Sequence, residues 1–326
     1  MKIAILKLVI IVLFALNGCA AWNAASAEEY FAIGMAYFDM GKFAEAEKWL
    51  IRAKSRDRTM NASEYNLGRI AFETQRYEDA AMHFESILKR DPYNVMALQA
   101  TAFTYIRMGD IEKAHDFYKR VLDLVPESAD DGYNYALVLF AMEKYDEVER
   151  ILSKEEYALL DNNDVLLLFA RAQKEQGKVE AIDSFDKWLT NNTNAKISFE
   201  FAQLLEEHDF FARALEEYRE INEGLTETST DPSKQDIGFT IARLLLIADS
   251  ESTEGVKELE TAVEAGFRDI EKIEELLEDE RISAANKDSI RIILSDAKRA
   301  AEEDETDVTD EETDITDEDE NEEADT

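Results

Sequence analysis

The stretch that decides the fold is residues 61–94, NASEYNLGRIAFETQRYEDAAMHFESILKRDPYN. Its apolar residues recur at helical spacing in two runs, which predicts two amphipathic helices joined by a short turn. Gly68 and Ala80 lack bulk, so the two helices can approach each other closely. The large apolar side chains expected around this contact are Leu67, Tyr77 and Phe84. Pro92 cannot continue a helix interior, so it closes the second helix.

The same pattern recurs about every 34 residues along the chain. The small residue of the first helix falls at Gly34, Gly68, Ala102, Ala136, Ala170 and Ala202. The partner position on the second helix holds Ala46, Ala80, Ala114, Val148, Ala181 and Ala214. Four residues further on stands a large apolar side chain: Leu50, Phe84, Tyr118, Leu152, Phe185 and Tyr218. One hairpin cannot bury its own apolar face, so these copies predict a stack in which each hairpin packs on its neighbours.

Three positions that hold register over six copies resemble the tetratricopeptide repeat (TPR) family over residues 27–228. The resemblance implies an all-α fold, an α-solenoid of antiparallel helix hairpins. The closing proline recurs as Pro126, whereas the first repeat has Arg58 at that place. Repeats four and five depart most from the family pattern, with Val148 in place of alanine and one residue fewer near Gly177.

The chain after the six hairpins is expected to end the array. The segment ETSTDPS, residues 227–233, is a break, and Asp231-Pro232 is expected to cap and begin the next helix. Residues 229–300 are expected to form a degenerate seventh hairpin and capping helices, because an array needs an end that covers its last apolar face. The helices expected here are residues 237–248, 253–265, 269–278 and 286–300. Gly266-Phe267 fits a helix C-cap followed by an apolar residue.

The chain is strongly acidic, with a formal net charge of −37 over 326 residues. Glu302–Thr326 contains 16 acidic residues and no Lys or Arg, so residues 301–326 are predicted to be a disordered acidic tail. The tail contains no glycine, which excludes an EF-hand calcium loop. Charge of this sign argues against nucleic acid and anionic lipid surfaces as partners, and favours an apolar or basic protein segment.

The N-terminus has the pattern of an export signal. Lys2 and Lys7 are followed by an apolar run over residues 8–16, which is too short to span a bilayer. Leu16-Asn17-Gly18-Cys19 resembles a bacterial lipobox, although asparagine is uncommon at its place. The alternative is an ordinary cleaved signal with an incidental cysteine.

The lipobox resemblance implies that residues 1–18 are a lipoprotein signal peptide. It further implies that the Cys19 thiol is diacylated, as by palmitate, with residues 19–26 as a lipidated tether. More than one acyl chain gives a durable membrane anchor. The residue after the cysteine is Ala20 rather than aspartate, which resembles the pattern of lipoproteins sorted to the outer membrane. We therefore expect an exported protein that is lipid-anchored to a membrane, at the outer membrane facing the periplasm.

The TPR resemblance also implies a ligand groove, because TPR arrays bind partners on the concave surface lined by the first helix of each hairpin. The corresponding residues are Phe31, Met35, Phe38, Tyr65, Arg69, Phe72, Phe103, Ile106, Arg107, Tyr133, Leu137 and Phe140. In repeats five and six the same face is polar, with Arg171, Lys174, Gln203, Glu206 and Glu207. Of the carboxylate clamp of chaperone-binding TPR domains only Asn66 and Arg69 remain. The alternative for the apolar set is that these side chains pack between adjacent hairpins.

The sequence offers no catalytic or metal-binding motif. It has no P-loop, no G-x-G-x-x-G and no G-x-S-x-G, and His83, His115 and His208 lie in different repeats without metal-ligand spacing. We therefore expect no enzyme activity, no cofactor and no metal. The predicted function is a membrane-anchored scaffold that binds a protein partner through the apolar groove. Two alternatives stay open: a subunit of an outer-membrane protein or pilus assembly machine, and an accessory lipoprotein of a ligand-uptake system that holds a small apolar molecule.

Overall fold

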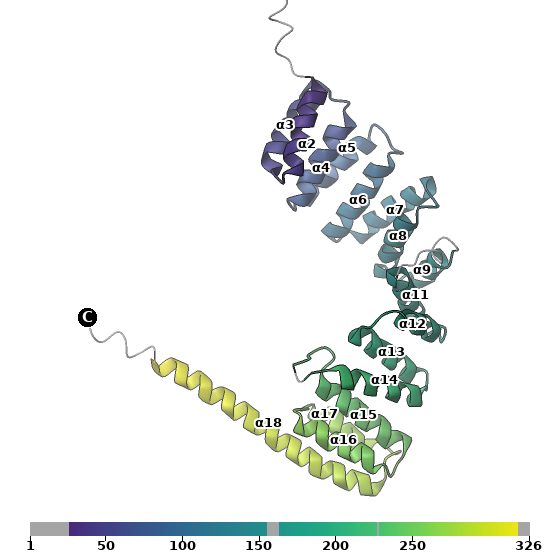
Figure 1. Ribbon diagram of the computed structural model, residues 1–326, viewed down its shortest axis with the longest axis vertical. Coiled ribbons are helices and arrows are strands. Elements are labelled where there is room, and N and C mark those ends of the chain that lie inside the picture. Colours follow the sequence, from purple (N-terminus) through teal and green to yellow (C-terminus); the bar gives the residue numbers. More distant parts are fainter. Residues whose placement is uncertain (1–25, 155–162, 227, 319–326) are drawn as a thin grey trace, which may run out of the picture. The chain divides into compact units, whose positions relative to one another are not determined.

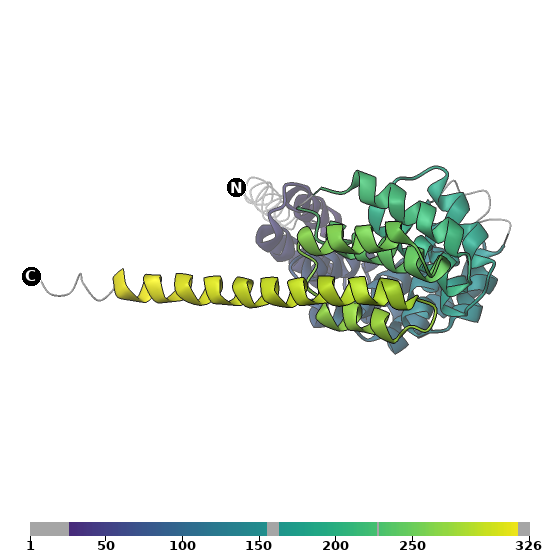
Figure 2. The ribbon, with the colours of Figure 1, turned by 90° about the horizontal axis from the view of Figure 1, so that it is seen from below.

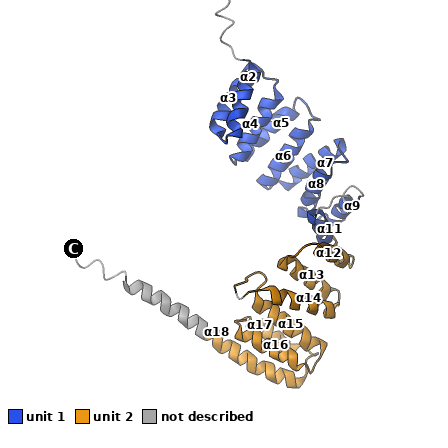
Figure 3. Ribbon diagram, in the orientation of Figure 1, with its two compact units in different colours: residues 1–172 blue, residues 173–326 orange. Residues whose placement is uncertain are grey.

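The computed structural model describes residues 26–154, 163–226 and 228–318, and for residues 303–318 it describes the backbone only. Within these residues the structure consists of sixteen helices and the turns between them, with no strand beyond an isolated bridge between Thr230 and Ser233. Consecutive helices pack as antiparallel pairs (Figure 1). The chain divides into two compact units, residues 1–172 and 173–326 (Figure 3). The all-α hairpin architecture predicted from the sequence is confirmed.

Unit 1 contains four complete hairpins. Their helices are α2 (Ala27–Asp39) with α3 (Phe43–Arg56), α4 (Asn61–Glu73) with α5 (Tyr77–Leu88), α6 (Val95–Met108) with α7 (Ile111–Leu124), and α8 (Ala129–Ala141) with α9 (Tyr145–Leu152). Helix α11 (Asn163–Glu175) begins in unit 1 and ends in unit 2. The predicted signal peptide, Cys19 and most of the predicted tether lie outside the described residues.

Unit 2 contains the later helices. They are α12 (Ala181–Leu189), α13 (Ala195–Glu207) with α14 (Phe211–Gly224), α15 (Lys234–Ala248) with α16 (Thr253–Glu264), α17 (Ile270–Glu278) and α18 (Ala284–Glu318). Helix α18 packs on α16 and α17 and then continues past their ends (Figure 2). Helices α17 and α18 share one core cluster with α15 and α16, so they cover the apolar face of that pair.

The repeating positions form the centre of each hairpin. Every small and large residue that the 34-residue spacing selects is buried, and Val148 in the weakest repeat is 0% exposed. A Cβ added at Gly68 would lie 2.6 Å from Cε1 of Phe84. Glycine is therefore required at this contact unless the two helices move apart.

The turn inside each hairpin also repeats. One residue in it has a positive φ in all six hairpins: Gly41, Gln75, Gly109, Glu143, Gly177 and Asp209. Three of these six are glycine, for which this conformation carries no steric penalty. The backbone of the turn is thus kept even where Gln75 and Glu143 replace glycine.

Two expectations for the C-terminal part need correction. Asp231-Pro232 does not cap the next helix: Ser233 is the N-cap, its hydroxyl accepts from the backbone N–H of Asp236, and α15 begins at Lys234. The predicted disordered tail is instead helical up to Glu318, because its first residues continue α18 without any Gly or Pro to end it. Residues 319–326 lie outside the described residues.

The predicted cap after α16 has the expected geometry. Gly266 has a φ of 105°, and the N–H of Phe267 donates to the carbonyl of Ala262 at 2.9 Å. Phe267 is only 3% exposed and stacks on Phe239 at 4.4 Å between ring centroids. This is a Schellman cap with its apolar residue packed on α15.

Candidate functional site

The predicted groove residues all lie on α2, α4, α6 and α8, and we call the outward side of these four helices the first-helix face. Phe103 on α6 is 45% exposed and Leu137 on α8 is 40% exposed, and these are the most open apolar side chains of the predicted set. The other apolar members are half-buried: Phe31, Met35, Phe38, Tyr65, Phe72, Ile106, Tyr133 and Phe140. The first-helix face thus has two exposed apolar side chains, and the other apolar members of the predicted set are half-buried beside them.

Part of the predicted set closes the hairpins. The rings of Phe38 and Phe72 each meet an aromatic residue at the start of the second helix, Phe43 and Tyr77, edge-on at 5.4 Å between centroids. Phe140 meets Tyr145 in the same way at 5.1 Å. The sequence predicts Tyr77 among the residues around the helix contact, but it did not lead us to Phe43 and Tyr145, which stand 34 residues before and 68 residues after Tyr77. Phe38, Phe72 and Phe140 therefore have a packing role as well as an exposed edge.

Other contacts join one hairpin to the next. The Arg69 guanidinium lies 4.4 Å above the ring of Phe38, and the rings of Phe72 and Phe103 are 5.4 Å apart. Arg107 Nη2 donates to the Tyr77 hydroxyl at 3.0 Å. Each contact joins one hairpin to the next, so a chain of ring and guanidinium contacts runs from α2 to α6.

Asn66 and Arg69 are engaged with the protein itself. Arg69 Nη1 donates to Asn66 Oδ1 at 3.1 Å, and Asn66 Nδ2 donates to the Ala62 carbonyl at 2.8 Å. The Arg69 head group also covers Phe38. This pair is arranged to support the aromatic layer rather than to clamp a terminal carboxylate.

The polar residues predicted on the later first helices form ion pairs between hairpins. Lys174 Nζ lies 3.3 Å from Glu200, and Glu206 accepts from Arg243 through both carboxylate oxygens, at 2.6 and 2.7 Å. These contacts tie α11 to α13 and α13 to α15. Gln203 and Glu207 are exposed. The corresponding positions of α11 and α13 are therefore polar, unlike those of α2, α4, α6 and α8.

A buried carboxylate lies on the other side of the second hairpin. Glu64 is only 2% exposed, and its two oxygens lie 2.5 Å from Lys54 Nζ and 2.9 Å from His83 Nδ1. Burial raises the pKa of Glu64, but the hydrogen bonds and charges of Lys54 and His83 outweigh burial and hold the pKa below its ordinary value. This cluster joins α3 to α4 and α5.

The geometry defines a helical-repeat protein whose hairpins share one contact pattern and one turn. Two family models match the chain: Tetratricopeptide repeat, over residues 31–95, and Anaphase-promoting complex, cyclosome, subunit 3, over residues 73–155. Together with the fold, these matches show that the chain contains tetratricopeptide repeats. Its fold is that of a protein-interaction scaffold.

Several known proteins are similar to the chain. An uncharacterized lipoprotein of Treponema pallidum is 23% identical over 164 residues, which cover 50% of this chain and 84% of that protein. A TPR repeat-containing protein of Methanocaldococcus jannaschii is 26% identical over 191 residues, 57% of this chain and 31% of that protein. A solved tetratricopeptide repeat protein of Parabacteroides merdae aligns with a TM-score of 0.52 at 21% identity, covering 77% of this chain and 97% of that one. The last likeness concerns the fold alone.

Among the helices of the described residues, none combines the length and the apolar composition that crossing a membrane requires.

Proposed function

We propose that the chain is an exported, lipid-anchored scaffold that binds a protein partner on the first-helix face. The observation that carries the proposal is the exposure of two large apolar side chains, Phe103 and Leu137, with the Phe103 ring packed beside that of Phe72. Large exposed apolar patches on a soluble monomer commonly mark an interaction site. A partner that covers it gains the free energy of removing those rings from water.

The charges beside these rings indicate the chemistry of the partner. Asp39 and Glu73 are exposed and directly follow Phe38 and Phe72 in the chain, and neither forms an ion pair with another described residue. The chain as a whole carries a net charge of −37, which favours the approach of a basic segment. We therefore propose that the partner offers apolar side chains flanked by Lys or Arg.

The anchor in this proposal rests on the sequence and on a relative. Leu16-Asn17-Gly18-Cys19 has the pattern of a lipobox. The similar Treponema pallidum protein is named an uncharacterized lipoprotein, and the chain covers 84% of its length. Both support acylation at Cys19 and attachment to a membrane, with the outer membrane as the proposed location.

Site-specific photo-crosslinking in cells tests the proposed surface. A crosslinker at position 103 or 137 should capture one and the same protein. The matched controls are position 51 on α3 and position 82 on α5, where Ile51 is 52% and Met82 is 63% exposed on second helices. Capture of the same protein with equal yield from the control positions would refute the assignment of binding to the first-helix face.

A further inference from the structure

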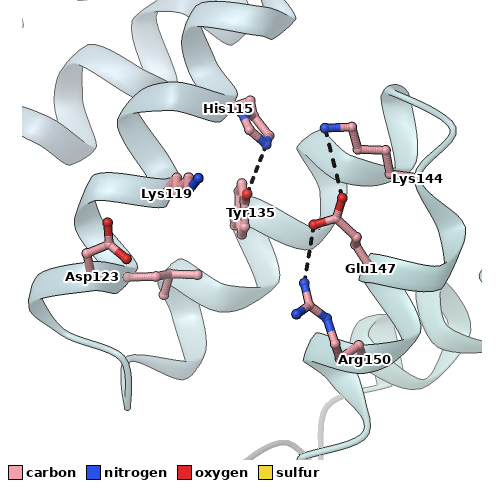
Figure 4. Close-up of a pocket in the computed structure, with 8 residues that line it drawn as sticks. His115, Lys119, Asp123, Tyr135, Lys144, Glu147 and Arg150 are labelled. Carbon is pink, nitrogen blue, oxygen red and sulfur yellow. Dashed lines mark hydrogen bonds and ion pairs between the residues drawn. The ribbon is translucent and has the colours of Figure 1, made fainter.

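A cavity of about 480 Å³ lies in unit 1 between α7 and α9, away from the first-helix face. Figure 4 shows Tyr135 of α8 between the side chains that the two flanking helices contribute. The lining residues are His115, Lys119, Leu122, Asp123, Tyr135, Lys144, Glu147 and Arg150. The volume falls within the range of small-ligand sites, which is roughly 300–1,000 Å³.

Cations outnumber carboxylates around this cavity. Lys119, Lys144 and Arg150 face it together with Asp123 and Glu147. Glu147 is shared, because its oxygens lie 4.0 Å from Lys144 Nζ and 3.3 Å from Arg150 Nη2. Among the described residues Lys119 has no ion-pair partner within salt-bridge distance, although Asp123 is one helical turn away. This local surplus of positive charge contrasts with the net charge of −37 on the whole chain, and it favours an anionic ligand.

The cations stand on opposite walls. Lys119 comes from α7, whereas Lys144 and Arg150 come from the turn before α9 and from α9 itself (Figure 4). A ligand with two anionic groups can therefore meet cations on both walls at once, through charge-assisted hydrogen bonds.

The centre of the cavity supplies a hydrogen-bonding pair. The Tyr135 hydroxyl lies 3.0 Å from His115 Nε2. Burial, followed by the charge of Glu147, raises the pKa of Tyr135, so its hydroxyl keeps its proton at neutral pH. The single proton of this hydroxyl can be donated to a ligand oxygen or to the imidazole.

We propose that this cavity binds a ligand with at least two carboxylates, one on Lys119 and the other on Lys144 and Arg150. Two sources have this chemistry: a small polycarboxylate, and a protein segment with closely spaced Asp and Glu side chains. The proposal is independent of the first-helix face, because none of the lining residues belongs to that face.

Calorimetric titration of the full chain with citrate, and separately with the peptide TDVTDEETDITD (the sequence of residues 306–317), tests the proposal. Lys119→Gln and Arg150→Gln should each weaken binding by about fivefold, the size expected for one partly exposed ion pair. Lys119→Arg should bind nearly as well as the unchanged chain. Glu147→Gln should bind more tightly, because it frees Lys144 and Arg150 from their internal partner.

The matched control is Lys89→Gln, which removes the same charge from an exposed lysine of unit 1 outside the cavity. Binding of citrate alone would assign the site to a small molecule, and binding of the peptide would assign it to a protein segment. Either result supports the proposal if the control is unaffected. No binding of either probe at millimolar concentration, an equal loss in Lys89→Gln, or weaker binding in Glu147→Gln would overturn it. Circular dichroism of each variant checks the fold, which replacements of exposed or half-buried side chains should leave unchanged.

Discussion

Replacing Gly68 with alanine tests the helix contact on which the hairpins depend. A Cβ at this position would lie 2.6 Å from Cε1, 2.8 Å from Cζ and 2.9 Å from Cδ1 of Phe84, well inside van der Waals contact. Phe84 is 2% exposed, and the ring of Tyr65 lies 5.4 Å from its own. Because the Phe84 ring is buried against Tyr65, either this ring shifts within the core or α4 moves away from α5.

Two opposing terms set the size of the effect. Alanine is favoured over glycine inside a helix by about 1 kcal/mol, whereas overpacking a filled core costs about 1–3 kcal/mol. The third hairpin holds Ala102 and Tyr118 at the same two positions in one core cluster, so a small helix separation can admit a ring beside alanine. We expect Gly68→Ala to lower the free energy of unfolding by about 1 kcal/mol net.

Denaturant unfolding followed by circular dichroism measures this change. Gly224→Ala is the control, because nothing lies within 4 Å of a Cβ at that helical glycine, and it should be neutral or slightly stabilising. Adding Phe84→Leu should relieve the clash, since the fourth hairpin pairs Ala136 with Leu152. The two changes should then be coupled by about 1 kcal/mol. Strict additivity, or a stabilised Gly68→Ala protein, would show that the proposed contact does not limit the helix spacing.

Three further predictions concern the anchor, the C-terminal segment and the buried carboxylate. Cys19→Ser should abolish acyl labelling and move the protein from the membrane to the soluble exported fraction, and unchanged membrane partitioning would contradict the lipobox interpretation. Deleting residues 302–326 should change the free energy of unfolding by less than about 0.5 kcal/mol, because Ala297 is the last buried side chain described in α18. A cooperative loss of the remaining helix signal would show that the deleted segment packs on the body. The pKa of Glu64 in the folded chain is below its ordinary value of 4.5, so its stabilising contribution is full above that pH and is lost as the pH falls through the lowered pKa. The stability difference between the unchanged chain and Glu64→Gln should therefore shrink in acid, and a constant difference down to about pH 3 would refute this account.

The fold could be predicted because the residues of its main contact, between the two helices of each hairpin, recur at a fixed spacing in the sequence. Ala46, Ala114 and Ala214 are all 0% exposed, as the repeat of small residues requires. The hairpin turns were harder to predict, because Gln75 and Glu143 adopt a positive φ at positions where a glycine would have indicated the turn. The extent of α18 was missed since acidic composition predicts disorder, while helix propensity and the absence of a stop signal continue the helix.

The candidate sites could be predicted only in part. The spacing placed Phe72 and Phe103 on the first-helix face, but it did not show that Phe72 also packs on Tyr77 whereas Phe103 is open to solvent. That difference depends on the side chains that surround each ring in the folded chain, which the spacing of residues alone does not specify. The cavity between α7 and α9 gave no sequence signal, because it depends on a gap between side chains such as Lys119 and Arg150.

The most direct test of the central claim is affinity for the crosslinked partner, measured together with the melting temperature, for Phe103→Ser. Phe103 is 45% exposed, so its replacement should change stability by less than about 1 kcal/mol. If the ring is a binding anchor, the affinity should fall at least about tenfold, or 1.4 kcal/mol. The control Met82→Ser, on a second helix, should leave affinity unchanged. Unchanged affinity for Phe103→Ser, or a loss fully explained by unfolding, would contradict binding on the first-helix face.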